Sequence, residues 1–297
     1  MISCRISFTF GENNRPARLF KVVYMRSTKL LLLNLSLVSV FLLVAYYYWF
    51  PAIWHCQTVR FGPFTSHSGG LYISDEATAS QRDSLLHSIA RSRQRIRAFW
   101  GRQVGDSSII FCHDKSTYSK FALMDEGAGC SLGTPTGSWI VLNPDGLNVD
   151  VISHEMCHDE LFTRLGWFKT KNSVPQWFDE GLALMVDYRF TNPDTTRRHH
   201  DYLDEWMMMT HHGSDGMELT DIRTVKGFFG GDRHYVNKAY LTSGLEVSRW
   251  LSVVGTSGLH DLLRAVRQGE SFDTAYQRLE KANRQLTDAP RLLGSGN

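Results

Sequence analysis

The stretch His154-Glu155-Met156-Cys157-His158 lies within a segment, residues 149–165, whose apolar and polar residues alternate with a helical period. The apolar residues of this helix include Val149, Ile152, Met156 and Leu161. Because helical residues four apart project from the same side, the imidazoles of His154 and His158 can approach one ion. The sequence therefore predicts a helix over 149–165 that presents two histidines together, with Glu155 beside them.

A third side chain for the same ion comes from the segment Trp177-Phe178-Asp179-Glu180-Gly181-Leu182-Ala183. A helix that starts after Pro175 would carry Glu180, and Gly181 would allow this helix to approach the first one closely. Two neutral imidazoles and one carboxylate form the open type of zinc site, which keeps a position for water and lowers the pKa of that water to about 7. The pattern therefore predicts His154, His158 and Glu180 as Zn²⁺ ligands in a hydrolytic site.

The segments around these residues resemble a known family. Residues 109–186 contain a strand at 109–111, a Gly-rich segment, an Ile-Val-Leu strand over 138–142, a turn at 143–146, His-Glu-x-x-His and Trp-x-x-Glu-Gly-Leu-Ala. This order resembles the peptidase MA-like group of gluzincin zinc metallopeptidases, over about a quarter of the chain. The resemblance implies an α+β domain with a small mixed sheet, an edge strand over the His-Glu-x-x-His helix and a helical C-terminal part.

The same resemblance implies that the protein hydrolyses peptide bonds and gives roles to single residues. Glu155 would act as general base and proton shuttle beside the ligands. Tyr240 matches a position whose hydroxyl stabilises the oxyanion of the tetrahedral intermediate, and Tyr235 is the alternative for that role. The strand over 138–142 could offer unpaired backbone groups to an extended chain, which favours a polypeptide substrate.

Two departures from the family pattern affect substrate and ligand geometry. The chain lacks the Gly-x-Met-Glu-Asn run with which aminopeptidases of this clan hold a free amino terminus, so an endopeptidase is favoured. Leu184 stands where a carboxylate, four residues after the glutamate ligand, often orients a histidine. Asp159, Asp179 and Asp187 are the alternatives for that task.

A second class of function fits the same motif. The chain could be a non-catalytic module of the cell envelope, in which zinc is structural or the cleft binds a peptide without cutting it. Glu155 favours the enzyme, because a purely structural zinc site has no use for a base beside its ligands.

The amino-terminal part predicts a membrane anchor. Residues 30–50 form an apolar stretch of 21 residues without a charge, long enough to cross a membrane as a helix. Residues 1–29 hold six Lys or Arg against one acidic residue, which predicts a cytoplasmic basic segment and an extracytoplasmic, periplasmic domain over 51–297. We expect an uncleaved, single-pass anchor in the inner membrane, and Met25 is an alternative start.

Residues 51–297 are enough for one α+β domain. Leu85, Ile89, Ile96 and Phe99 predict an amphipathic helix, and Gly255 to Gly258 predict a turn. The segment 191–233 lacks a clear period and predicts a substrate-side insertion, whose four paired histidines we interpret as exposed polar residues.

Charge and cysteine content limit the partners. The chain carries a formal charge of +2, and because residues 1–29 contribute +5, the remainder is slightly acidic, which gives no indication of nucleic-acid binding. The arginines between 91 and 97 predict a solvated helix surface. Cys56, Cys112, Cys130 and Cys157 would lie in an oxidising compartment, where two disulfides allow three connectivities. Cys157 could instead be a small buried residue beneath the zinc helix. The sequence predicts no oligomeric state.

Overall fold

The computed structural model describes residues 15–123, 127–192 and 197–288. The chain divides into two compact units; in the sequence, the first ends at Trp54 and the second begins at His55. The first unit contains the helix α1 (Arg15–Trp49). Its part from Leu31 to Trp49 is long and apolar enough to cross a membrane, and none of this part is buried. A signal sequence has the same length and composition, so this helix is consistent with either a membrane anchor or a signal sequence.

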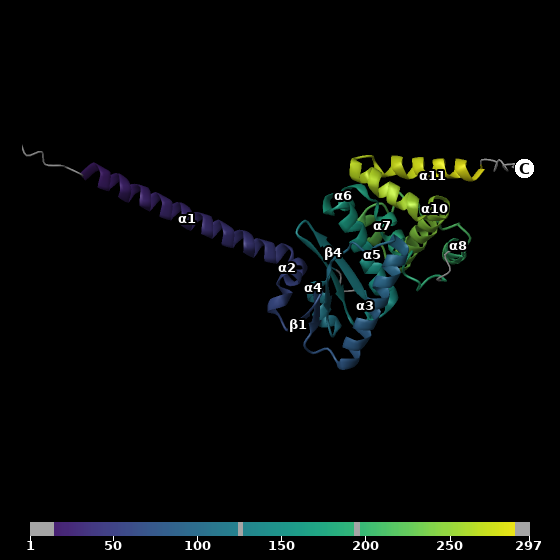
Figure 1. The fold of residues 1–297 in the computed structure, drawn as a ribbon, viewed down its shortest axis with the longest axis horizontal. Helices are drawn as coiled ribbons and strands as arrows, with labels where there is room; N and C mark the ends of the chain where they lie inside the picture. The colour runs from purple at the N-terminus through teal and green to yellow at the C-terminus, as the bar shows by residue number, and fades with distance from the viewer. Residues whose placement is uncertain (1–14, 124–126, 193–196, 289–297) are drawn as a thin grey trace, which may run out of the picture. The chain divides into compact units, whose positions relative to one another are not determined.

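The second unit is a mixed α+β fold, as predicted, with one five-stranded sheet in the order β1-β2-β3-β5-β4 (Figure 1). The strands are β1 (Phe64–His67), β2 (Leu71–Ser74), β3 (Ser108–Phe111), β4 (Gly129–Thr134) and β5 (Gly137–Leu142). The three central strands β2, β3 and β5 are parallel, while β1 and β4 pair antiparallel at the two ends of the sheet. The prediction that residues 138–142 form the edge strand is therefore wrong: β5 is interior, and β4 forms the edge.

Helices cover the sheet and build the carboxyl-terminal part. After α2 (Pro51–Thr58), the helices are α3 (Ala79–Trp100), α4 (Lys115–Phe121), α5 (Val149–Leu165), α6 (Trp167–Ser173), α7 (Gln176–Ala183), α8 (Arg198–Met209), α9 (Val225–Phe229), α10 (Arg233–Gln268) and α11 (Phe272–Asp288). Short 3₁₀ turns lie at Val59–Phe61 and Pro144–Gly146. The predicted helix over 149–165 is confirmed. In Figure 1, α10 and α11 lie together in the yellow-green carboxyl-terminal layer.

The core forms where α3 and α5 pack against the sheet. Ile109 and Ile140 of the central strands join Leu85 of α3 and Ile152 of α5 in one buried cluster. Helix α5 starts at the cap Asn148, whose side chain accepts a hydrogen bond from the Val151 amide at 2.9 Å. The position of α5 is therefore fixed by the Asn148 cap at its amino end and by the packing of its apolar face.

Two acidic residues near the end of α5 bind the loop that leads into β3. Glu160 is fully buried and accepts hydrogen bonds from the amides of Val104 and Gly105, at 2.7 and 2.8 Å. Asp159 accepts from the Ser107 amide at 3.0 Å and from the Ser138 hydroxyl at 2.7 Å. These bonds attach α5 to the sheet end, and they explain why two buried carboxylates are tolerated here.

Helices α7 and α10 approach closely at Gly181. The sequence predicted that this glycine would allow a close approach to α5, so the partner helix in that prediction is wrong. A Cβ atom at Gly181 would lie 2.6 Å from the Ser243 carbonyl oxygen and 2.6 Å from Val247 Cγ2. Helix α10 also contains the residues 255–258, for which a turn was predicted. The predicted turn is confirmed at Gly255, whose angles (φ 66°, ψ −176°) are not helical and which separates two helical segments of α10, whereas residues 256–258 are helical. Glycine adopts this positive φ without steric cost.

Candidate metal centre

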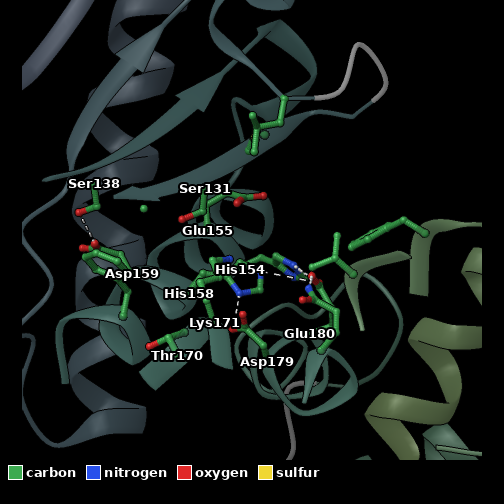
Figure 2. Close-up of a pocket in the computed structure, with 18 of the residues that line it drawn as sticks. Ser131, Ser138, His154, Glu155, His158, Asp159, Thr170, Lys171, Asp179 and Glu180 are labelled. Carbon is green, nitrogen blue, oxygen red and sulfur yellow. Dashed lines mark hydrogen bonds and ion pairs between the residues drawn. The ribbon is translucent and has the colours of Figure 1, made fainter. Parts of the chain in front are cut away.

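Three predicted ligands converge in the structure although they come from two helices. His154 and His158 project from the same side of α5, and Glu180 reaches them from α7 (Figure 2). One ligand atom from each residue lies within 4.8 Å of the other two, so this group could hold a metal ion. His154 and Glu180 are 6% and 5% exposed.

The two distances from Glu180 to the histidines suit a tetrahedral ion. Glu180 Oε2 lies 3.4 Å from His154 Nε2 and 3.6 Å from His158 Nε2. Ligands at about 2.0–2.1 Å from a tetrahedral Zn²⁺ are about 3.3–3.4 Å apart. The same Oε2 atom is buried without a hydrogen-bond partner, whereas Oε1 accepts a hydrogen bond from Gln176 Nε2 at 2.7 Å. One oxygen of Glu180 is thus held by protein, and the other is left for a cation.

Two aspartates orient the two histidines. His158 Nδ1 shares a 2.7 Å hydrogen bond with Asp179 Oδ1, whereas His154 Nδ1 lies 3.3 Å from Asp187 Oδ2 without hydrogen-bond geometry. Such contacts turn the Nε2 atoms toward the ion position and favour the tautomer that can bind a metal. Of the three aspartates considered from the sequence, Asp159 is the one that does not contact an imidazole, since it binds Ser107 and Ser138.

Asp187 is itself held by a neighbouring charge. It is fully buried, and both of its oxygens accept hydrogen bonds from the Arg189 side chain, at 2.5–3.0 Å. Burial opposes ionisation of Asp187, but His154 and Arg189 outweigh it and lower its pKa. Asp187 therefore stays negative beside His154. It supplies the carboxylate that the family pattern places at position 184, where this chain has a leucine.

The centre is strongly negative for its degree of burial. Burial disfavours a charged imidazole, yet the carboxylates of Asp187, Glu180 and Glu155 raise the pKa of His154 to about 10. The pKa of His158 is also raised, because Asp179 and Glu180 outweigh burial. A field that attracts protons onto two imidazoles also attracts a metal cation.

Glu155 faces the same cavity as the ligands but is not part of the ligand cluster. It is 8% exposed, and burial raises its pKa, against the lowering effect of the two histidines. A Cβ atom at Gly129 of β4 would lie 3.0 Å from Glu155 Cγ, so a larger residue there would require the Glu155 side chain to shift by a few tenths of an ångström. The carboxyl group is thus placed between the candidate ion position and β4.

The structure distinguishes the two candidate tyrosines. Tyr240 on α10 lines the cavity, and its ring centroid is 6.3 Å from that of His154. The Tyr235 hydroxyl instead donates to the Gly227 carbonyl at 2.9 Å, and Tyr235 does not line this cavity. Tyr240 is therefore the candidate that faces the site, while its role stays a prediction.

The cavity has a volume of about 400 Å³ and is formed mainly by β4, α5 and α7. Gly129, Ser131 and Gly133 of β4 line it, and Ser131 lies beside Glu155 in Figure 2. Val225 and Phe229 of α9 also line it, so part of the predicted insertion lies on this side. Of the four histidines of the insertion, His200, His211 and His212 are exposed, as predicted, whereas His199 is half-buried.

The sequence reasoning missed two residues of the site. Gln176 orients Glu180, and its position four residues earlier on a predicted helix was the available signal. Tyr118 of α4 lines the cavity with a buried hydroxyl that has no hydrogen-bond partner. Nothing in the local sequence around Tyr118 indicated this, because α4 reaches the site only through the fold.

The four described cysteines are free thiols, so none of the considered disulfides is present in this structure. Cys157 is 1% exposed, and its thiol lies 3.6 Å from the Leu182 carbonyl oxygen, which agrees with the alternative of a small buried residue. Burial raises the pKa of Cys112 and of Cys130 to about 12. Cys4 lies outside the described residues.

No protein-family model matches the chain, and no curated protein matches it significantly. The candidate centre is therefore supported by its own geometry.

Proposed function

We propose that this chain is a zinc-dependent peptidase of the gluzincin type, held at a membrane by its amino-terminal helix. The observation that carries the proposal is the convergence of ligand atoms of His154, His158 and Glu180 within 4.8 Å of one another, with Glu155 in the same cavity. A structural zinc site would have four protein ligands, and the described residues offer three. The donor set of two imidazoles and one carboxylate suits zinc.

In this proposal His154, His158 and Glu180 hold the ion, and Asp179 and Asp187 keep the histidines in place. When bound, zinc would polarise the substrate carbonyl and lower the pKa of water. Glu155 accepts the proton of the attacking water and passes it to the leaving nitrogen of the peptide. Proton transfer by one positioned carboxylate commonly contributes about 10²–10⁴-fold to the rate.

Tyr240 is proposed to donate its hydroxyl to the oxyanion that forms on the substrate. The pKa of Tyr240 is raised well above its usual value, first by burial and then by Glu180 and Glu155, so the phenol keeps its proton. A protonated phenol can donate where negative charge develops, and loss of such a donor commonly costs about 10²–10³ in rate.

The edge strand supports a polypeptide substrate. Within the described residues, β4 pairs with β5 alone, so its other side offers backbone groups to an extended chain. Gly129, Ser131 and Gly133 have small side chains or none and line the cavity, which leaves room beside Glu155. The role first expected of residues 138–142 thus passes to β4. Endopeptidase action remains the favoured proposal.

The test uses the full chain in a nonionic detergent. We expect about one zinc per chain by elemental mass spectrometry, and cleavage of a peptide library that stops when a chelator removes the metal. Glu155→Gln should keep zinc and lose activity by about 10³-fold or more. The matched control is Glu205→Gln, which changes an exposed acid on α8 and should leave activity unchanged.

Two results would contradict the proposal. Activity that survives in Glu155→Gln would exclude the assigned base. A wild-type chain that binds zinc but cuts nothing would favour the alternative, a non-catalytic envelope module that binds peptides or uses zinc structurally.

We also propose that the anchor lies in the inner membrane with the second unit on the extracytoplasmic side. The charge excess of residues 1–29 supports this orientation. External protease added to spheroplasts should then digest a tag placed after residue 297 and spare one placed before residue 1. The reverse pattern would place the candidate centre in the cytoplasm.

A further inference from the structure

We call the cavity around His154, His158 and Glu180 the metal cavity. A second cavity, which we call the basic cavity, shares no lining residue with it. It has a volume of about 600 Å³ and is lined, among others, by Arg95, Tyr188, Arg198, His199, Ser248 and Leu251. These residues come from α3, α8, α10 and the segment that follows α7. The volume falls within the range of pockets that bind small organic ligands.

Arg198 is the unusual residue of the basic cavity. It is 5% exposed, and its Nε atom is buried without a hydrogen-bond partner. Within the described part of the chain no carboxylate forms an ion pair with it. Its guanidinium carbon lies 5.4 Å from the centroid of the Tyr188 ring, and its charge also acts on the neighbouring Tyr202 hydroxyl. A buried cation is costly unless an anion or hydrogen bonds compensate it, so this position is suited to an anionic ligand.

The second arginine of the cavity is already compensated. Arg95 Nη1 lies 2.5 Å from Asp150 Oδ1 and donates to the Val186 carbonyl at 2.8 Å. The same guanidinium stacks on the Tyr188 ring, with 4.0 Å from its carbon to the ring centroid. Asp150 is therefore engaged with Arg95, and among the described lining residues there is no acidic side chain that could neutralise Arg198.

His199 does not add to the positive charge of the cavity. Burial lowers the pKa of His199, and the neighbouring His200 and Arg249 lower it further, against the raising effect of Glu246, so His199 is neutral near pH 7. Its ring contacts the Ser248 hydroxyl at 3.5 Å. Among the described lining residues, Arg198 is thus the arginine that has no acidic partner.

The rest of the lining suits a molecule with an apolar body. Phe99, Met185 and Leu251 supply apolar surface, and Ser248, Ser252 and Thr256 supply hydroxyl groups. Gly255, where α10 is kinked, also lines the cavity, so a helical segment restarts there. The amino end of a helix favours negative charge, in agreement with Arg198.

We propose that the basic cavity binds an organic monoanion, in which a carboxylate pairs with Arg198 and an aromatic or aliphatic body contacts Phe99, Met185 and Leu251. One uncompensated guanidinium matches one negative charge, and its planar fork matches a carboxylate. This site is independent of the proposed peptidase activity, because it shares no side chain with the metal cavity.

The test measures binding of 2-naphthoate to the full chain in nonionic detergent by equilibrium dialysis, with detergent alone as a blank. The matched neutral probe is naphthalene-2-carboxamide, which has the same body without the charge. We expect 2-naphthoate to bind at least about tenfold more tightly than the amide. Arg198→Gln should weaken 2-naphthoate binding by at least about tenfold, since a charge-assisted pair is lost.

Two further variants separate a built site from general attraction. Arg93→Gln removes a charge from the same helix as Arg95, but Arg93 lines a different cavity near Gly69, so binding should change by less than about twofold. Ala98→Trp keeps every charge and fills part of the basic cavity at an exposed helix position, so binding should fall by at least about tenfold.

Each remaining outcome would overturn the inference. If wild type binds neither probe, there is no ligand site. If the amide binds as well as 2-naphthoate, the cavity is merely apolar. If Arg93→Gln weakens binding as much as Arg198→Gln, the anion is attracted by the overall positive charge and not by Arg198. If Ala98→Trp has no effect, the ligand binds outside the basic cavity.

Discussion

The metal cavity and the basic cavity hold opposite excess charges. Carboxylates outnumber cations around His154 and His158, whereas the basic cavity holds Arg198, with which no carboxylate among the described residues forms an ion pair. Helix α10 contributes to both, with Tyr240 in the first cavity and Ser248 in the second. Since a buried excess charge is unfavourable by itself, each cavity is suited to a ligand of opposite sign. The excess negative charge therefore favours a metal cation in the metal cavity, and the positive charge of Arg198 favours an anion in the basic cavity.

The same segment serves both cavities with neighbouring residues. Met185 and Tyr188 line the basic cavity, while Asp187 between them contacts His154. The separation of the two sites therefore depends on the position of α7 and the residues that follow it. Substitutions can therefore alter the metal cavity alone, both cavities through the contact between α7 and α10, or neither cavity.

The largest expected effect comes from Asp179→Asn, which alters the metal cavity alone. The amide keeps the size of the side chain but removes the charge 2.7 Å from His158 Nδ1. Zinc affinity should fall by about 10- to 100-fold, measured by competition with a coloured chelator. Binding of 2-naphthoate should stay unchanged.

Asp159→Asn is the matched control for this experiment. Asp159 lines the same cavity but contacts Ser107 and Ser138, so zinc affinity should be kept. Equal losses of affinity in both variants would show that general negative charge, not the orientation of His158, holds the metal.

A smaller effect, shared by both cavities, is expected from Gly181→Ala. The new Cβ atom would lie 2.6 Å from the Ser243 carbonyl oxygen, so α7 must move away from α10. The free energy of unfolding should fall by about 1–3 kcal/mol, measured by urea titration with tryptophan fluorescence. Zinc and 2-naphthoate should both bind more weakly, because Glu180 and Met185 move with α7.

Gly137→Ala provides the comparison for overpacking. Its Cβ atom would meet the Trp139 ring at 3.4 Å, an ordinary contact, so the free energy of unfolding should change little. If Gly181→Ala were equally mild, the close approach of α7 to α10 would not determine the geometry of either cavity.

The smallest effect is expected from Glu280→Gln on α11, which lines neither cavity. Hydrogen bonds from Arg249 lower the pKa of Glu280 from 4.5, against a smaller opposing effect of burial. A lowered pKa means that the folded state favours the carboxylate. Its contribution is therefore present above pH 4.5 and is lost as the pH falls below that value.

Glu280→Gln should lower the free energy of unfolding at pH 7 by less than about 1 kcal/mol, because the pair is partly exposed. The difference from wild type should shrink below pH 4.5, in urea titrations at several pH values. Both ligands should bind as in wild type. A difference that grows in acid would show that the ion pair does not stabilise the fold.

Local periodicity and spacing predicted the helix over residues 149–165 and the buried strand at 109–111. They also predicted a helix after Pro175 and an apolar amino-terminal helix. The approach of His154 and His158 could be predicted as well, because helical spacing places them on one face; Glu180, on a second helix, was predicted from the pattern of its segment and not from helical spacing. These features depend on residues close together in the chain.

The tertiary structure decided which strand lies at the edge, since strand pairing depends on contacts between distant segments. It also decided that Asp179 and Asp187, and not Asp159, contact the histidines. The basic cavity brings together residues such as Arg95, Arg198 and Ser248, which have no common motif. Sequence periodicity specifies the faces of single elements, whereas the charge balance of a cavity depends on how packing brings those faces together.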